Sequence, residues 1–475
     1  MDNPINIAII GGGASGTITA INLLNKLKVA VHIYIIERSD KKLWRGNAYS
    51  SGLEYEILNV PAGKMSLYND LPDDFYTWLL KKHNADNSPI TPGSFVSRRW
   101  YGEYLTDRVT QAKQHASHIY FENVLAEVTG IQTGIDSAYQ LNFQNGRSIN
   151  ADYLIFATGN EPPGNVFAND IKPGNKYIGN PWSDAPFEFV GAEDDILFLG
   201  TGLTMVDHAI SLHLRGHKGK VFAFSRHGYL PLSHKETQPF NFEIPDNNSD
   251  LSLVLSHIKS NIKTAKTQNI NWRSVLDSLR GKTAHIWKQL DSNSKKIFLQ
   301  RFRTYWEIHR HRMPASSVDI LRKMTDSGQL KLYSGKALTA DTTGAKIRFQ
   351  YRSQKNKTIQ NIVIDRVINC TGPQADYTKT RNTLIKNLFQ KGWMQQDELK
   401  LGIETGARGE IIKQNGEPLQ NAYAIGPLRK ACEWESTAIR EIRTQAEEVA
   451  ALVLKGIEND KQQQLHSLEL HLHSK

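Results

Sequence analysis

The sequence has few cysteines and no long apolar segment, and both absences exclude whole classes of protein. Cys370 and Cys432 are the only cysteines among 475 residues, which excludes a disulfide scaffold and a Cys-x-x-Cys redox pair. No uncharged apolar run approaches the roughly 18 residues of a membrane-spanning helix. The first residues lack the basic start and apolar stretch of a secretory signal. We therefore expect a cytoplasmic protein without a membrane segment.

Signatures of metal and protein-nucleophile chemistry are also missing. The sequence has no His-Glu-x-x-His, no zinc-type cysteine spacing and no Ser-His-Asp signature, so we expect no metal site. The composition nevertheless provides ordinary cores, with 39% hydrophobic and 9% aromatic residues. A chain of this length predicts two or three folded domains.

The N-terminal segment has the pattern of a dinucleotide-binding unit. Residues 5–10 predict a buried strand, residues 17–27 a helix and residues 31–37 a second strand. Between the first two lies Gly-x-Gly-x-x-Gly, whose glycines allow a tight turn and close approach to a pyrophosphate. The helix N-terminus offers N–H groups to the phosphates, and Glu37 can accept bonds from ribose hydroxyls. The predicted contacts are Gly11, Gly13, Ser15, Gly16, Glu37 and Arg38.

A second unit of the same kind begins at residue 195. It combines a strand at 196–199, a glycine loop, a helix at about 203–215 and a strand at 221–225. Met205 replaces the third glycine, and Arg226 is assigned to the place that Glu37 has in the first unit. An arginine there can bind a 2′-phosphate, although it can also be a plain surface residue. The pairing predicts FAD on the first unit and NADPH on the second, the latter through Gly200, Gly202, Leu203, Thr204, Arg226 and His227.

The chain also repeats itself at longer range. Residues 119–159 and 330–372 both read as strand, turn, hairpin and strand, with Asp152 matching Asp365. Their strand ends, Ala157-Thr158-Gly159 and Cys370-Thr371-Gly372, also match. A duplicated pattern of this kind predicts two related folds. The predicted fold class is α/β, with two Rossmann-like dinucleotide-binding domains and a helical insertion.

The repeat sets the expected domain boundaries. We predict the first part of an FAD-binding domain at 1–190, an NADP-binding domain at 191–365 and a return to the FAD-binding domain at 366–475. The return segment is expected to contain a helix from about Ser436 to Lys455. Residues of about 250–325 show apolar spacing typical of helices, which predicts an insertion in the second domain.

The insertion is strongly basic. Residues 251–330 hold 8 Lys and 7 Arg against 4 Asp and 1 Glu, so the chain's whole formal charge of +10 lies there. Such a segment can attract nucleic acid or an acidic ligand, or it can be a solvated helical face. Within it, His309 and Arg312 would share a helical face and could hold a carboxylate or phosphate. His234 is a further substrate candidate.

In combination, several motifs resemble one family, the FAD/NAD(P)-binding proteins among the flavoproteins with two dinucleotide-binding domains. They are GGGASG (11–16), ILNVPAGKMSLYND (57–70), FATGN (156–160), GTGLTMVD (200–207), SRHG (225–228), YWEIHRHRMP (305–314), INCTGP (368–373), YAIGP (423–427) and WESTAIREIR (434–443). The resemblance implies an FAD domain interrupted by an NAD(P)H domain. This layout is similar to that of flavin-dependent N-hydroxylating monooxygenases.

The resemblance also implies further FAD contacts. Val128 matches the strand that meets the adenine, Thr158 and Gly159 match the strand end beside FAD, and Gly426 matches a turn that usually reads Gly-Asp. Here Pro427 replaces the acid. The resemblance also implies that a helix capped by Ser436 and Thr437 points its N-terminus at the flavin. The flavin ring would be lined by Asn59, Met65 and Ser66.

Three functions remain open from the sequence. The first is an NADPH-dependent FAD monooxygenase acting on a small amine or thiol metabolite, with an anionic substrate among the options. The motif of Baeyer–Villiger enzymes, F-x-G-x-x-x-H, is absent from residues 177–182, which argues against ketone oxidation. The second is an NADPH:acceptor reductase without oxygen insertion. The third is a flavin-containing binding protein whose basic insertion takes nucleic acid or an acidic partner.

Overall fold

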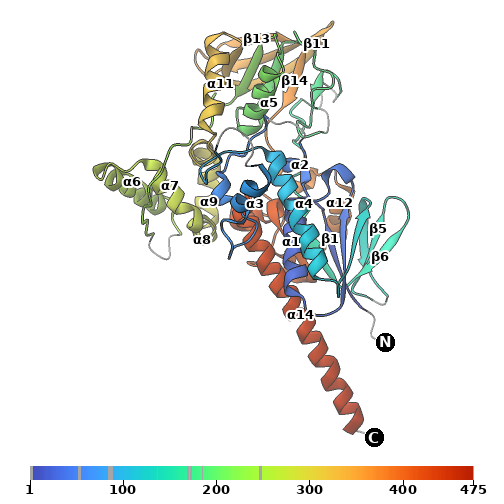
Figure 1. Ribbon diagram of the computed structural model, residues 1–475. Helices are drawn as coiled ribbons and strands as arrows, with labels where there is room; N and C mark the ends of the chain where they lie inside the picture. Colours follow the sequence, from blue (N-terminus) through green and yellow to red (C-terminus); the bar gives the residue numbers. More distant parts are fainter. Residues whose placement is uncertain are drawn as a thin grey trace. The chain divides into compact units, whose positions relative to one another are not determined.

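The computed structural model describes residues 4–51, 55–83, 89–135, 137–167, 171, 174–183, 186–244 and 249–473. The chain forms two compact units, and the second interrupts the first (Figure 1). The first unit comprises Met1–Gly52, Val60–Asn160 and Ala375–Lys475, and the second comprises Leu53–Asn59 and Glu161–Gln374. This confirms the predicted fold class, an α/β chain in which one dinucleotide-binding domain interrupts another.

The first unit is built on a six-stranded sheet in the order β15-β16-β7-β1-β2-β3. Strands β16, β7, β1, β2 and β3 run parallel, and only β15 is antiparallel to its neighbour. Parallel strands covered on both faces are expected to be continuously apolar, and Ile7 to Ile10 are all buried. The strand bounds are β1 Ile5–Ile10, β2 Val31–Glu37, β3 Tyr120–Leu125, β7 Tyr153–Phe156, β15 Glu410–Ile412 and β16 Pro418–Ala424.

Helices and a small second sheet complete the first unit. Helix α1 packs against both α4 and α14 (Figure 1). The predicted hairpin after β3 forms a three-stranded sheet, β4-β5-β6, which shares a hydrophobic cluster with α12. The bounds are α1 Ala14–Lys26, α2 Gly46–Tyr49, α3 Asp74–His83, α4 Arg98–His115, β4 Val128–Thr133, β5 Tyr139–Phe143, β6 Ser148–Ala151, α12 Thr383–Gln390, α13 Lys430–Glu433 and α14 Ile439–His473.

The C-terminal helix differs from the one predicted at about 436–455. Helix α14 begins at Ile439, three residues later, and continues to His473. Trp434, with a φ of +61° that cannot belong to a right-handed helix, ends the preceding helix α13. The hydrogen bonds of α14 begin at Ala438, whose carbonyl accepts the backbone N–H groups of Glu441 and Ile442.

The second unit repeats this architecture with a seven-stranded sheet, β13-β12-β11-β10-β9-β14-β8. Strands β11, β10, β9, β14 and β8 are parallel, and β11, β12 and β13 form antiparallel pairs. Because β8 pairs with β14, the chain enters this unit before residue 191, where the sequence placed the boundary. The bounds are β8 Tyr177–Ile178, β9 Ile196–Leu199, β10 Val221–Ser225, β11 Leu330–Thr343, β12 Lys346–Ser353, β13 Ile359–Ile364 and β14 Arg366–Asn369.

The predicted helical insertion follows β10. In Figure 1 its helices gather in one yellow-green group. Helix α11 belongs to the Rossmann core instead, since Leu321 and Met324 share a buried cluster with Met205 of α5. No helix of the described ranges is long and apolar enough to cross a membrane. The bounds are α5 Leu203–Leu214, α6 Leu251–Thr267, α7 Trp272–Leu279, α8 Thr283–Gln289, α9 Ser292–Ile297, α10 Arg303–Arg310 and α11 Ala315–Asp326.

The internal repeat extends to individual hydrogen bonds. Asp152 accepts the backbone N–H of Asn6 at 2.8 Å, just inside the start of β1. Asp365 accepts the N–H of Asp195 at 2.9 Å, just before β9. Each aspartate therefore fixes the strand that leads into a glycine loop, in the same way in both units.

Candidate functional site

The glycine loop of the first unit has a geometry that only glycine allows. Gly11 has a φ of +110°, and a Cβ there would lie 2.3 Å from the carbonyl oxygen of Ala157. A Cβ on Gly16 would lie 1.9 Å from the carbonyl oxygen of Gly11. Helix α1 starts directly after Gly13, and no side chain caps it. The N-cap residue therefore offers no side-chain acceptor to the first N–H groups of the helix. This is the arrangement that holds a pyrophosphate in dinucleotide-binding folds.

Glu37 fastens the same loop to the end of β2. Its carboxylate accepts the backbone N–H groups of Gly12 and Arg38 at 3.0 Å each, and of Ser39 at 3.2 Å. An ionised carboxylate offers about four lone-pair positions, so acceptor capacity remains for a ribose hydroxyl. Arg38 itself is exposed beside the loop.

The ends of β7 and β16 reach the same edge of the sheet. Thr158 and Gly159 follow β7, and Gly159 has a φ of +72°. Gly426 follows β16 with a φ of +76°, and a Cβ there would lie 2.9 Å from Oγ of Ser15. The structure therefore brings all of these predicted residues to the carboxyl ends of parallel strands, where ligands bind in this class of fold.

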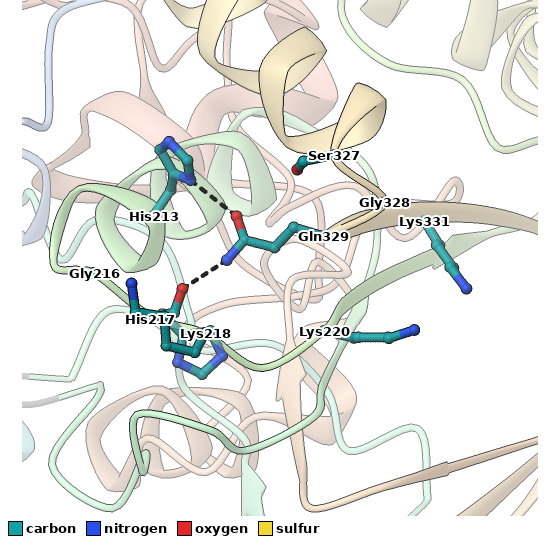
Figure 2. Close-up of a pocket in the computed structure, with 9 residues that line it drawn as sticks. All are labelled: His213, Gly216, His217, Lys218, Lys220, Ser327, Gly328, Gln329 and Lys331. Atoms are coloured by element: carbon teal, nitrogen blue, oxygen red, sulfur yellow. Dashed lines mark hydrogen bonds between the residues drawn. The ribbon is translucent and has the colours of Figure 1, made fainter.

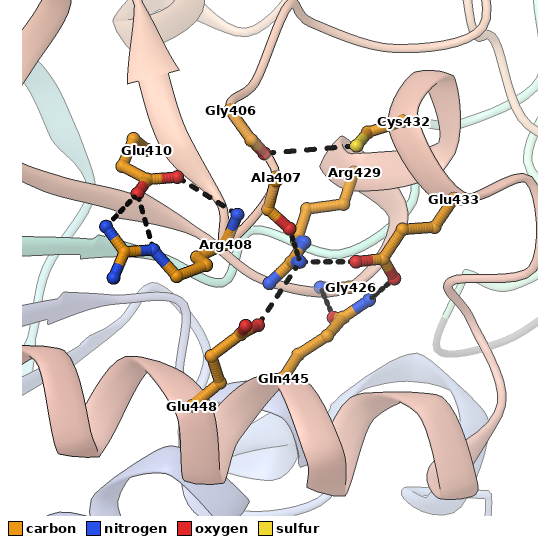
Figure 3. Close-up of polar contacts among 10 residues, drawn as sticks. All are labelled: Gly406, Ala407, Arg408, Glu410, Gly426, Arg429, Cys432, Glu433, Gln445 and Glu448. Carbon is orange, nitrogen blue, oxygen red and sulfur yellow. Dashed lines mark hydrogen bonds and ion pairs between the residues drawn. The ribbon is translucent and has the colours of Figure 1, made fainter. Parts of the chain in front are cut away.

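A buried polar chain that the sequence did not predict holds the Gly426 turn (Figure 3). The N–H of Gly426 donates to Gln445 at 2.8 Å, and Gln445 donates to Glu433 at 2.6 Å. Glu433 forms an ion pair with Arg429, which is 1% exposed and also lies 3.5 Å from Glu448. The turn that lacks an acid at Pro427 is thus held by an amide backed by a buried carboxylate. In the sequence, only the spacing of four residues between Arg429 and Glu433 indicates any of these contacts, because residues so spaced can pair on a helix.

The prediction that Ser436 and Thr437 cap the last helix is wrong. Both residues precede Ala438, where the hydrogen bonds of α14 begin. Ser436 is fully buried, and its hydroxyl has no hydrogen-bond partner in the described structure. Thr437 is exposed. A buried hydroxyl of this kind is suited to a bound ligand, because buried polar groups are otherwise satisfied.

The predicted ring-lining residues fall in different parts of the fold. Met65 and Ser66 belong to the first unit and are buried, whereas Asn59 belongs to the second. The Ser66 hydroxyl is engaged within its own loop, donating to the Leu71 carbonyl at 2.7 Å. Val128 is 6% exposed and begins β4, in a cluster with residues of β1 and β2.

The second glycine loop reproduces the first. Gly200 has a φ of +108°, and a Cβ there would lie 2.2 Å from the carbonyl oxygen of Cys370. A Cβ on Gly202 would meet nothing within 4 Å, and Leu203 and Thr204 form the first turn of α5. The tight turn at Gly200 and the open space beside Gly202 therefore fit the pyrophosphate of a second dinucleotide. Burial raises the pKa of the Cys370 thiol, which therefore stays protonated and unreactive.

The strand register corrects the position assigned to Arg226. Gly11 donates to Ile36 and Gly200 donates to Phe224, so Ser225, not Arg226, occupies the place of Glu37. Ser225 also takes over the contact with the loop, since its hydroxyl lies 2.9 Å from that of Thr201. Arg226 follows as an exposed residue, the counterpart of Arg38, and the exposed His227 ring stacks on Tyr229. No carboxylate of β10 therefore faces the loop.

Two of the three substrate candidates, His309 and Arg312, contact α7, although not as predicted. Helix α10 ends at Arg310, so His309 and Arg312 do not share a helical face. Arg312 is instead buried in an ion pair with Asp277 of α7, and the His309 ring packs edge-on against Trp272 at 5.0 Å. His234 donates its backbone N–H to the Met313 carbonyl, and its Nε2 lies 3.0 Å from the Asn59 carbonyl.

A pocket of about 490 Å³ lies at the opposite edge of the second sheet (Figure 2). Gln329 spans it, accepting from His213 at 2.9 Å and donating to the His217 carbonyl at 2.7 Å. The pocket is formed by loops before β10 and β11, at the amino ends of these strands. Dinucleotides bind at the carboxyl ends, so we do not assign a cofactor to it.

Comparison with known proteins agrees with this geometry. Residues 8–161 match the family model described as FAD-NAD(P)-binding. The structure is similar to ornithine N-hydroxylase of Kutzneria sp. 744 (TM-score 0.65, 14% identity, 96% of this chain and 100% of that chain). It is also similar to ornithine hydroxylase of Pseudomonas aeruginosa (0.66, 14%, 96% and 100%) and L-lysine 6-monooxygenase of Pseudomonas syringae (0.63, 15%, 94% and 98%). No curated protein matches the sequence. The chain therefore has the fold of these structures, and its residues 8–161 match the FAD-NAD(P)-binding family model.

Proposed function

We propose that the chain is an NADPH-dependent FAD oxidoreductase that inserts oxygen into a small amine or thiol metabolite. The observation that carries the proposal is the pair of glycine loops, each at the carboxyl edge of its own parallel sheet. Further support comes from the fold, because structures described as amine-hydroxylating enzymes are similar over 94–96% of this chain.

In this proposal each unit holds one dinucleotide. The loop Gly11–Gly16 and the start of α1 bind the FAD pyrophosphate, while Glu37 binds the adenosine ribose. The loop from Gly200 to Thr204 binds the NADPH pyrophosphate. Bound FAD supplies the redox chemistry, accepting a hydride and reducing oxygen. The protein needs no nucleophile of its own, which agrees with a buried, protonated Cys370.

Arg226 and Ser225 are proposed to select NADPH over NADH. Ser225 leaves no carboxylate to repel a 2′-phosphate, and Arg226 is exposed at the strand end that the loop faces. The Arg226→Gln variant is expected to lower kcat/KM for NADPH by about tenfold to a hundredfold, because a charge-assisted hydrogen bond contributes about 1.5–3 kcal/mol. Steady-state oxidation of NADPH and NADH should show this loss for NADPH only.

Lys220→Gln is the matched control for Arg226→Gln. Lys220 is an exposed cation of the same unit, but it precedes β10 at the amino edge of the sheet. Its loss should leave both kcat/KM values unchanged. Equal losses for NADPH and NADH in Arg226→Gln would contradict the assignment of the 2′-phosphate to Arg226.

The proposed reaction is tested by following oxygen through a complete turnover. Purified protein is reduced with NADPH without air and then mixed with oxygen and a panel of primary amines and thiols. We expect that one substrate diverts oxygen from hydrogen peroxide into a hydroxylated product, detected by mass spectrometry with ¹⁸O₂. Reduction by NADPH with all oxygen recovered as peroxide would instead favour an acceptor reductase. Folded protein that binds no flavin would contradict both.

A further inference from the structure

The helical insertion contains a buried cluster in which positive charge exceeds negative charge. Arg312 is 3% exposed and Arg273 is 8% exposed. Asp277 forms an ion pair with Arg312 and also attracts Arg273. By contrast, the third buried arginine, Arg429, has two carboxylates beside it. Burying an arginine is costly unless its charge is balanced, so a pair that shares one carboxylate needs a further anion.

Both arginines are held in place by the backbone around them. The segment that carries Arg312 is fixed by reciprocal hydrogen bonds, from Met313 to Leu232 and from His234 to Met313, both at 2.9 Å. Arg273 lies on α7, donates through Nε to the Ser233 carbonyl at 2.9 Å, and lies over the ring of Trp272. The two guanidinium groups are therefore positioned by the fold and are not mobile surface groups.

Donor groups in this cluster remain available. Asp277 engages only Nη2 of Arg312, while Nε and Nη1 of that buried guanidinium have no hydrogen-bond partner in the described structure. Burial lowers the pKa of Arg273, and the charge of Arg312 lowers it further, as expected for cations that share one counter-ion. The free Nε–H and Nη1–H lie on the two different edges of the guanidinium, which share Nη2. Each of them can donate a charge-assisted hydrogen bond to an oxygen of a carboxylate or phosphate.

We propose that Arg312, together with Arg273, forms an oxyanion-binding site for the carboxylate or phosphate group of a small ligand. The site goes beyond the proposed redox reaction and does not require it. It also assigns a role to part of the basic insertion. Because both arginines are more than nine-tenths buried, a nucleic acid backbone cannot reach them as it reaches surface cations.

The site is tested by anion binding to the full chain, measured separately from NADPH oxidation. Inorganic phosphate and acetate are titrated while the melting temperature and the heat of binding are followed. We expect at least one of them to bind saturably to the wild-type protein. Arg312→Gln should weaken that binding by roughly tenfold or more, because it removes a charge-assisted pair of hydrogen bonds.

Two further variants make the test independent of the folding of Arg312→Gln. Asp277→Asn keeps a hydrogen-bond acceptor but removes the competing charge, so it should tighten anion binding, and Arg273→Gln should weaken it. Arg322→Gln is the control, since Arg322 is 68% exposed and paired with Asp319 on α11. Weaker binding in Asp277→Asn, equal binding in wild type and Arg312→Gln, or no binding of either anion would overturn the proposal.

A third titration identifies the source of the oxyanion. Adenosine 2′,5′-bisphosphate carries the phosphate that is specific to NADPH. If Arg312→Gln leaves its affinity unchanged, the site belongs to a separate small ligand, as we propose. Loss of its affinity in Arg312→Gln but not in Arg226→Gln would show that the oxyanion is the cofactor's own and would overturn the assignment to a separate ligand. Failure of NADPH oxidation alone would bear only on the proposed function.

Discussion

The Gly16→Ala variant is expected to lose most of its bound FAD. Alanine normally stabilises the interior of a helix by about 1 kcal/mol relative to glycine. Here the sign is reversed, because the added Cβ would lie 1.9 Å from the backbone oxygen of Gly11. Backbone atoms must shift to relieve this overlap, at a cost of about 1–3 kcal/mol. The shift displaces α1 from the glycine loop, so we expect FAD to bind at least about tenfold more weakly.

The flavin-to-protein absorbance ratio after gel filtration measures this loss. Gly202→Ala is the matched control, because it adds the same methyl group to the second glycine loop. There φ is −81° and a Cβ meets nothing within 4 Å, so the fold and the FAD content should both be retained. Retention of FAD at the wild-type level by Gly16→Ala would contradict the assignment of the pyrophosphate to this loop.

Local patterns in the sequence predicted the parts of this fold that depend on local geometry. Glycine spacing identified both strand–loop–helix units, since positive φ at Gly11 and Gly200 is a property of the turn itself. The match of Asp152 with Asp365 likewise corresponds to one hydrogen bond repeated in each unit. Such features are determined within a few residues or by direct repetition.

Features that depend on tertiary pairing could not be predicted in this way. The assignment of Arg226 was off by one residue, because the pairing of β10 with β9, and not the motif, determines which residue faces the loop. The prediction that His309 and Arg312 share a helical face was wrong because α10 ends at Arg310, before Arg312. Arg312 instead pairs with Asp277, which is distant in the sequence. Likewise, Gln445 reaches Gly426 across 19 residues, a separation at which no periodicity signals a contact.

The Arg429→Leu variant is expected to destabilise the first unit strongly. Glu433 is 8% exposed, and without Arg429 its carboxylate would be buried with no opposing charge. Removing one partner of a buried ion pair typically costs about 3–5 kcal/mol, mainly because the remaining charge is uncompensated. The loss is transmitted to the cofactor site, since Glu433 orients Gln445 and Gln445 holds the N–H of Gly426 (Figure 3). Urea titration followed by flavin release should therefore show a lower midpoint.

The double variant Arg429→Leu/Glu433→Leu separates lost charge balance from lost packing. Apolar replacement of both partners removes the uncompensated charge, so much of the stability should return. Recovery of stability should be incomplete. Gln445 would still accept the N–H of Gly426, but its own amide group would no longer have the Glu433 carboxylate to donate to. Arg408→Leu is the control, since Arg408 pairs with Glu410 at a side-chain exposure of 55% and should cost less than about 1 kcal/mol. If the double variant releases flavin as readily as Arg429→Leu, the buried charge is not the cause. The network would then stabilise the turn through shape alone.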